Sequence, residues 1–178
     1  MNKLLVVVDM QNDFISGALG TQEAEEIVPL VLEKIDSYRA AGDKIIFTQD
    51  THFPDYLKTL EGKNLPIKHC IKDSWGWELV EEIKALVSLE NHQIFEKHTF
   101  ACLEMARSLC ESLDYNIESI EIVGLCTDIC VVSNALLLKA FLPETPISVS
   151  ASCCAGIAPH IHEAALRILE SCQIEINP

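Results

Sequence analysis

Short apolar runs alternate with longer amphipathic segments along almost the whole chain. The apolar runs predict β-strands at residues 3–8, 43–49, 92–97, 118–124, 145–150 and 173–177. In the segments between them, apolar residues recur at helical spacing, which predicts helices at residues 21–41, 75–87, 100–113, 128–140 and 159–172. Positions 4–8 are apolar without interruption, which is typical of a strand buried on both faces of a parallel sheet.

This alternation predicts one α/β domain that spans residues 1–178, with a parallel sheet and helices on both of its faces. Right-handed crossovers between successive strands give this doubly wound arrangement. A length of 178 residues with 49% hydrophobic residues suits one domain with a full core. Ligands of such open sheets bind at the carboxyl ends of the strands, so catalytic and ligand-binding residues are expected there.

The junction between the strand at 118–124 and the helix that follows it carries two cysteines, Cys126 and Cys130. A thiol near a helix N-terminus meets unpaired backbone N–H groups and the positive end of the helix dipole, which both favour thiolate. The same N–H groups can receive the oxyanion of an acyl-transfer intermediate. A buried cysteine is also commonly an inert small hydrophobe, so the junction alone leaves both interpretations open.

Two other predicted strands end on charged residues. The first strand leads into Asp9, whose carboxylate can serve as a general base, although Asp9 or Asp13 could equally cap a turn. The strand at 92–97 ends on Lys97, and a lysine at a strand end is usually just solvated. Because three strands end on or lead into an aspartate, a lysine and a cysteine, their coincidence at one sheet edge indicates an active site.

A second group of polar residues follows the strand at 43–49. Asp50 and His52 are two residues apart, so their side chains share one side of an extended chain. The long polar loop at 50–73 adds Glu61 and His69, and loops of this length are usually functional or disordered. Together these residues offer nitrogen and oxygen ligands suited to zinc, iron or manganese. Asp and His are also common in ordinary loops, so this set alone does not establish a metal site.

The chain resembles the isochorismatase-like cysteine hydrolases at three places: DMQNDF at residues 9–14, Lys97, and GLCTDICV at residues 124–131. The resemblance extends from Lys3 to about Ser152. It implies a six-stranded sheet of order 3-2-1-4-5-6 and a catalytic triad of Asp9, Lys97 and Cys130.

The same resemblance assigns roles to residues beside the triad. It implies a cis peptide bond between Leu125 and Cys126, and an oxyanion hole made by the backbone N–H groups of Cys126 and Cys130. Phe14, Leu125 and Trp75 are expected to line the substrate pocket.

Within this family, DTH at residues 50–52 followed by PIKHC at residues 66–70 resembles the metal site of the nicotinamidases. Isochorismatases proper lack this site. The resemblance implies that Asp50, His52, Glu61 and His69 hold one divalent transition metal, zinc in the first place, with iron or manganese as alternatives.

The chain also departs from the nicotinamidase pattern. Many members carry a third histidine where Lys58 stands, although some place a glutamate at the position of Glu61. Many carry a tryptophan wall where Asn64 and Leu65 stand, and Trp75 or Trp77 is the candidate to replace it. These departures bear on the substrate more than on the chemistry.

The resemblance implies an amidohydrolase that converts nicotinamide to nicotinate and ammonia through a thioester, a step of NAD salvage. Another small-amide or carbamoyl hydrolase of the family is the alternative within this class. A catalytically silent ligand-binding homologue is the alternative from another class. An isochorismate-type ether hydrolase is less favoured, because it needs no metal and typically no nucleophilic cysteine.

Composition limits the partners. A net charge of −14 disfavours nucleic acid and anionic membranes, and no apolar run reaches the roughly 18 residues of a membrane helix. The N-terminus is too short before the first strand for a signal peptide. Eight cysteines scattered through predicted strands and helices favour reduced thiols and a cytoplasmic location. We further expect a small-molecule amide substrate and a homo-oligomer.

Overall fold

Six parallel strands form one sheet in the part of the chain that the structure describes, residues 2–90, 92–111 and 117–178 of a computed structural model. The strand order is β3-β2-β1-β4-β5-β6, as expected from the sequence. The strands are β1 (Asn2–Val8), β2 (Lys44–Asp50), β3 (Gln93–Lys97), β4 (Ile117–Leu125), β5 (Ile147–Ala155) and β6 (Glu175–Asn177).

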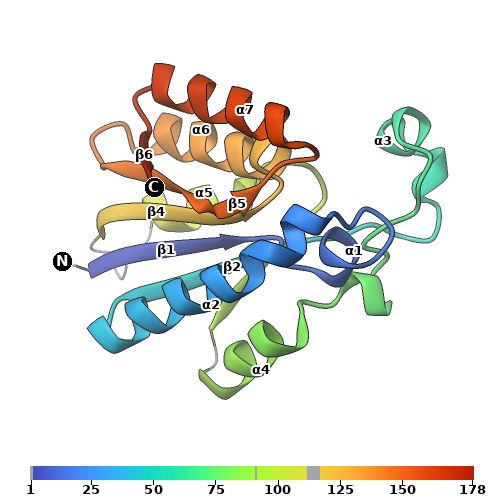
Figure 1. Cartoon of the computed structure of the whole chain (residues 1–178), viewed down its shortest axis with the longest axis horizontal. Coiled ribbons are helices and arrows are strands. Elements are labelled where there is room, and N and C mark those ends of the chain that lie inside the picture. Colours follow the sequence, from blue (N-terminus) through green and yellow to red (C-terminus); the bar gives the residue numbers. More distant parts are fainter. Residues whose placement is uncertain (1, 91, 112–116) are drawn as a thin grey trace.

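Helices cover both faces of this sheet (Figure 1). One face carries α2 (Gln22–Ala41) and α4 (Glu81–Glu90), and the other carries α5 (Leu103–Glu111), α6 (Val132–Phe141) and α7 (Pro159–Ser171). Two short helices, α1 (Asn12–Ile15) and α3 (Leu60–Asn64), lie beyond the carboxyl ends of the strands. Shorter helical turns are η1 (Tyr56–Lys58), η2 (Trp75–Trp77) and η3 (Thr127–Val131).

The central strand β1 is buried on both faces, which explains its uninterrupted apolar sequence. Leu4 and Val6 belong to the core under α5, α6 and α7. Leu5 and Val7 belong to the core under α2 and α4. Because successive side chains point to opposite faces, one apolar run contributes to two cores.

The predicted helix at 75–87 is wrong in its first half. The chain instead forms the 3-10 turn η2, and α4 begins only at Glu81. Gln11 forms a bridge with Leu79, and the Val80 N–H donates to the Met10 carbonyl oxygen. This pairing with the segment after β1 holds the backbone extended and overrides the local helical pattern.

Two other predicted helices differ at their ends. The helix expected at 128–140 begins with the π-helical turn η3, and only residues 132–141 are α-helical. The helix expected at 100–113 is α5, which covers 103–111, while residues 112 and 113 lie outside the described part. Insertions of π geometry into a helix occur frequently at functional sites.

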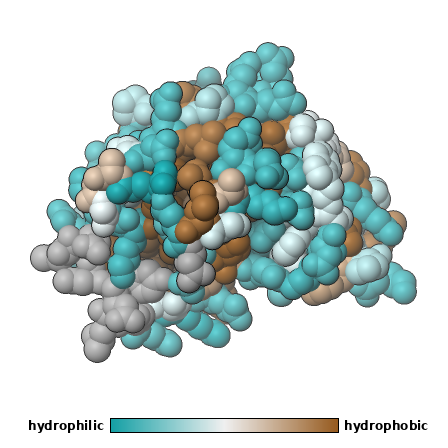
Figure 2. All heavy atoms as spheres, turned by 90° about the horizontal axis from the view of Figure 1, so that it is seen from below, coloured by the Kyte–Doolittle hydropathy of each residue, from teal (hydrophilic) through white to brown (hydrophobic). Residues whose placement is uncertain are grey.

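The face shown in Figure 2 is mostly hydrophilic, with apolar side chains gathered between polar ones. Among the described residues, no helix is both long and apolar enough to cross a membrane.

Candidate active site

Asp9, Lys97 and Cys130 meet at the carboxyl edge of the sheet, although they lie directly after β1, at the end of β3 and in the turn after β4. Lys97 Nζ lies 2.8 Å from Asp9 Oδ2 and 3.3 Å from Cys130 Sγ. The same nitrogen lies 2.9 Å from Asp50 Oδ1. All four residues are buried. The ammonium group of Lys97 therefore joins the predicted nucleophile and general base to a predicted metal ligand.

The backbone around Asp9 is unusual. Asp9 has a φ of 48°, in the left-handed region that costs a non-glycine residue energy and is common at functional sites. Thr48 on β2 donates a hydrogen bond of 2.7 Å from Oγ1 to Asp9 Oδ1. On the opposite side, a side chain at Gly124 would collide with the Val8 carbonyl oxygen, so β4 approaches β1 closely beside Asp9.

Burial and the attraction between opposite charges shift the pKa values of all three groups. Burial raises the pKa of the Asp9 carboxyl, although Lys97 acts in the opposite direction. It also raises the pKa of the Cys130 thiol well above its ordinary value. Burial alone would lower the pKa of Lys97, but attraction by Asp9, Cys130 and Asp50 raises it instead. Desolvation therefore favours the neutral thiol of Cys130 over the thiolate expected from the helix terminus, and Lys97 acts in the opposite direction.

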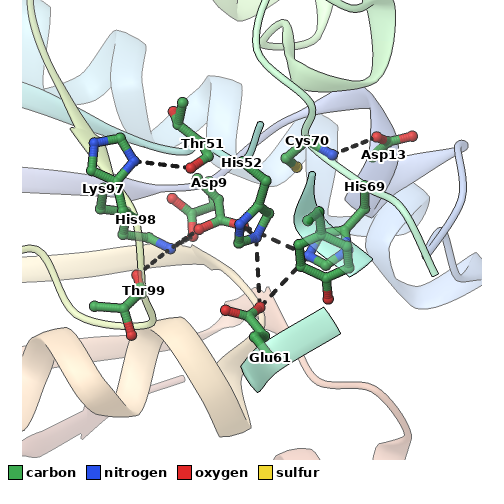
Figure 3. A network of polar contacts seen from close by, with 12 residues as sticks. Asp9, Asp13, Thr51, His52, Glu61, His69, Cys70, Lys97, His98 and Thr99 are labelled. Atoms are coloured by element: carbon green, nitrogen blue, oxygen red, sulfur yellow. Dashed lines mark hydrogen bonds and ion pairs between the residues drawn. The ribbon is translucent and has the colours of Figure 1, made fainter. Parts of the chain in front are cut away.

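The predicted metal ligands also lie together. Ligand atoms of Asp50, His52 and His69 all lie within 4.8 Å of one another. Glu61 Oε1 lies 3.5 Å from His52 Nε2 and 4.0 Å from His69 Nε2. Figure 3 shows Glu61 pointing from α3 toward both imidazole rings. The structure thus brings together side chains from β2, the residues that follow it, and two parts of the long loop.

The donor atoms fit a divalent transition metal. His52 Nε2 is buried without a hydrogen-bond partner among the described residues, although it lies 2.9 Å from Asp50 Oδ2. His69 Nδ1 lies 2.9 Å from the Ile67 carbonyl oxygen. Because a carbonyl oxygen only accepts, this nitrogen carries the proton and Nε2 presents a lone pair. Two imidazole nitrogens beside two carboxylates form a ligand set suited to zinc, iron or manganese.

Two residues without an assigned role in the sequence hold this site in place. The Gln11 side chain clamps the backbone of Asp50, because its Oε1 accepts from Asp50 N–H at 2.7 Å and its Nε2 donates to Asp50 O at 2.9 Å. Asp13 Oδ2 accepts from the Cys70 N–H at 2.7 Å, next to His69. Both residues lie in the DMQNDF segment, so their closeness to Asp9 in the sequence is the feature that could have indicated their role.

A cavity of about 310 Å³ lies between the predicted nucleophile and two of the predicted metal ligands. Cys130 contributes to one wall, and Asp50 and Glu61 contribute to another. Phe14 and Leu125 line it as expected. The other apolar side chains in its lining include those of Leu19, Leu65, Phe100, Ile129 and Ile157. The cavity is apolar over most of its surface and polar where the candidate chemistry lies.

The expectation for Trp75 is wrong, because Trp75 is not part of the cavity lining and is 60% exposed. The Asn12 side-chain amide donates to the Trp75 carbonyl oxygen at 2.8 Å, so this hydrogen bond to α1 uses the backbone of Trp75 and not its indole ring. Trp77 does not line this cavity either, and its Nε1 donates to Thr51 Oγ1 at 2.9 Å.

Cys126 lies at the cavity wall and directly precedes the turn η3, which carries Cys130. The peptide bond between Leu125 and Cys126 is cis, as expected. The carbonyl oxygen of Cys126 accepts from the N–H groups of Ile129 at 3.1 Å and Val131 at 3.0 Å. Burial raises the pKa of the Cys126 thiol to about 12, so this side chain stays neutral.

Comparison with known proteins places this site in a family. The chain is 29% identical to the nicotinamidase of Saccharomyces cerevisiae over 122 residues, which is 53% of this chain and about half (56%) of the yeast protein. It is 25% identical to the nicotinamidase of Escherichia coli over 94% of this chain and 90% of that protein. The crystal structure of the pyrazinamidase of Pyrococcus horikoshii in complex with zinc matches with a TM-score of 0.84 and 27% identity, over 99% and 98% of the two chains. The family model of the isochorismatase domain matches residues 3–176, and the chain therefore belongs to the isochorismatase family.

Proposed function

We propose that this protein is an amidohydrolase that uses Cys130 as its nucleophile and converts nicotinamide to nicotinate and ammonia. The observation that carries the proposal is Lys97 Nζ, which lies within 3.3 Å of Cys130 Sγ and of carboxylate oxygens of Asp9 and Asp50. The cavity supports the proposal, because Cys130 lines one part of its apolar wall and Asp50 and Glu61 line another. The similarity to nicotinamidases supports the choice of substrate.

In the first half-reaction, the Asp9 carboxylate takes the proton of the Cys130 thiol while the sulfur attacks the carboxamide carbon. The raised pKa of Asp9 makes this carboxylate a stronger base than an exposed aspartate. The backbone N–H groups of Cys126 and Cys130 receive the oxyanion of the tetrahedral intermediate. Asp9 then gives the proton to the departing nitrogen, and ammonia leaves a thioester on Cys130.

In the second half-reaction, water attacks the thioester carbon. Asp9 takes a proton from this water, and the same N–H groups receive the second oxyanion. Collapse of the intermediate breaks the carbon–sulfur bond, releases the carboxylic acid and returns the proton to the Cys130 sulfur. Throughout both halves, the ammonium of Lys97 offsets the negative charge that Asp9 and the sulfur share in turn.

Asp50, His52, Glu61 and His69 would hold one divalent transition metal, with zinc as our proposed ion. When bound, the metal supplies a Lewis acid for the ring nitrogen of the substrate. Phe14 and Leu125 contact the ring from the apolar side of the cavity, and this contact favours a flat aromatic amide over a charged acyl group.

Ammonia release from a panel of amides tests the proposal. The panel contains nicotinamide, pyrazinamide, benzamide, an aliphatic amide and an N-carbamoyl amino acid. We expect nicotinamide and pyrazinamide to be hydrolysed fastest, Cys130→Ala to abolish turnover, and the exposed control Cys110→Ala to retain it.

Other results would change the assignment. Turnover of the N-carbamoyl amino acid alone would make the protein a carbamoyl hydrolase. Turnover of no amide, together with retained binding of nicotinamide, would make it a ligand-binding homologue. Activity of Cys130→Ala within tenfold of the wild type would contradict the covalent mechanism.

A further inference from the structure

A histidine outside the proposed triad contacts the turn that carries the nucleophile. His162 lies in the first part of α7, and its Nδ1 is 2.8 Å from Thr127 Oγ1. Thr127 is fully buried, whereas His162 is partly buried. The hydrogen bond therefore joins a surface helix to a buried hydroxyl that lies three residues before Cys130.

Thr127 begins the π-helical turn η3 and directly follows Cys126. Within the turn, the N–H groups of Ile129 and Val131 donate hydrogen bonds to the Cys126 carbonyl oxygen. Single π-helical turns are rare and occur frequently at functional sites, so the contacts that hold this turn are of interest. In this turn, the Thr127 side chain makes such a contact with α7.

A second contact joins the same turn to the end of β5. Asp128 Oδ1 accepts a hydrogen bond of 3.0 Å from the Ile157 N–H. A side chain at Gly156 would stand 2.6 Å from Asp128 Oδ1 and 3.0 Å from the His162 backbone nitrogen. Little space is left for a side chain at Gly156, so the turn, the loop after β5 and α7 are closely packed where they meet.

We propose that His162 is a positioning residue, which acts through Thr127 to fix the turn carrying the Cys126 and Cys130 N–H groups. The inference rests on the proposed function, because these N–H groups matter only for acyl transfer. A displacement of an oxyanion donor by a fraction of an ångström lowers the rate without removing the nucleophile.

The surroundings of His162 suit a neutral ring that makes a fixed hydrogen bond. His162 lines a second cavity of about 290 Å³ between α2 and α7, together with Glu23, Glu26 and Glu163. Burial lowers the pKa of His162, although Asp128 and Glu163 act in the opposite direction. A neutral imidazole can accept a hydrogen bond from the Thr127 hydroxyl group at Nδ1, which a charged ring cannot do.

The test compares variants that remove or keep the hydrogen bond. His162→Leu removes it from α7, and Thr127→Val removes it from the turn at nearly equal volume. His162→Asn keeps a polar atom near the position of Nδ1, whereas His162→Gln places its amide farther along, near Nε2. The matched control is His160→Leu, the same change at an exposed position of the same helix.

Three measurements separate positioning from general loss of structure. Release of p-nitrophenol from p-nitrophenyl acetate reports acyl transfer to Cys130 whether or not nicotinamide is the substrate. Hydrolysis of nicotinamide reports the proposed reaction. Alkylation of Cys130 by iodoacetamide, followed by mass spectrometry, measures the reactivity of the sulfur in a reaction that forms no oxyanion. If the wild type cleaves the ester but not nicotinamide, the proposed substrate is wrong while His162 can still be judged from the ester.

We expect kcat on the ester to fall at least tenfold in His162→Leu and in Thr127→Val, with Cys130 alkylation and KM within about twofold of the wild type. The double variant should be no slower than Thr127→Val, because both changes remove one contact. His162→Asn should recover most of the rate, and His160→Leu should match the wild type.

A loss below tenfold, an equal loss of alkylation, or additive losses in the double variant would overturn the proposal. If His162→Leu does not fold, the comparison of His162→Asn with His162→Gln tests the proposal. His162→Asn must then exceed His162→Gln in ester turnover at equal alkylation, and equal or reversed rates would overturn it.

Discussion

At the scale of single residues, the site is a small set of charges removed from water. Asp9 is fully buried and forms an ion pair with Lys97. The same lysine also forms an ion pair with Asp50. Burial of two carboxylates against one ammonium is tolerated because each oxygen near Lys97 gains a short ion pair. The chemistry therefore depends on whether Asp9 can change its protonation state beside a lysine that stays charged.

Asp9→Asn tests this dependence. The amide is nearly isosteric and can still contact Thr48 and Lys97, but it cannot take a proton from Cys130. We expect kcat for amide hydrolysis to fall about 10²–10⁴-fold, the usual contribution of a general base. Steady-state ammonia release measures the loss, and Asp55→Asn, an exposed position, is the control. A variant that retains a tenth of the wild-type rate would assign the proton transfer to another group.

At the scale of secondary-structure elements, Asn134 connects the helix after the nucleophile to the loop before α5. It is fully buried in α6. Its Oδ1 accepts from the Cys102 N–H at 2.8 Å, and its Nδ2 donates to the Cys130 carbonyl oxygen at 2.7 Å and to the Phe100 carbonyl oxygen at 3.2 Å. One side chain thus satisfies three backbone groups from two elements that line the cavity.

Asn134→Leu should lower stability, because it leaves the buried Cys102 N–H without its partner. An unsatisfied buried donor costs about 1–3 kcal/mol. For a chain of this size, each 1 kcal/mol lowers Tm by about 2–4 °C. Differential scanning calorimetry measures the shift, and Asn64→Leu at an exposed position provides the control. An unchanged Tm would show that water or a relaxed backbone replaces the amide.

Local patterns predicted most elements but not the contacts between them. The burial of β1 on both faces follows from its apolar run, whereas the strand order was implied by the resemblance to a known family. Residues at strand ends indicated an active site, because the sheet brings separated positions together there, and the resemblance supplied the triad and the ligand set. The bond between His162 and Thr127 spans 35 residues and involves residue types that are common on helices, so no local pattern marks it. Pairing of Gln11 with Leu79 likewise displaced the start of α4.

At the scale of the whole molecule, the carboxyl edge of the sheet collects the chemistry. The neighbouring strands β1 and β4 lead to helices on opposite faces, and this switch opens the space that the cavity occupies. The chain has a net charge of −14, and two of its carboxylates, those of Asp50 and Glu61, face this cavity. A bound cation would offset that local charge and stabilise the folded state.

Metal removal tests this expectation. Purified protein should contain about one divalent transition metal per chain, measured by plasma mass spectrometry. Chelation should abolish amide hydrolysis and lower Tm, because Asp50 and Glu61 then repel each other without a cation. Alkylation of Cys130 should persist, since the thiol remains beside Lys97 and Asp9. Readdition of zinc should restore hydrolysis, and full activity in metal-free protein would discard the metal site.

The position of Lys97 has a thermodynamic consequence. Its ammonium touches Asp50, in the ligand set, and also touches Asp9 and Cys130, in the proposed triad. A cation on Asp50 changes the charge that this ammonium meets, and an acyl group on Cys130 replaces the thiol that it contacts. Cation occupancy and acylation are therefore linked, and linkage is reciprocal: each shifts the free energy of the other by the same amount. The thioester form should hold its metal with an affinity that differs from that of the resting protein, so the acyl group and the cation each report on the state of the other.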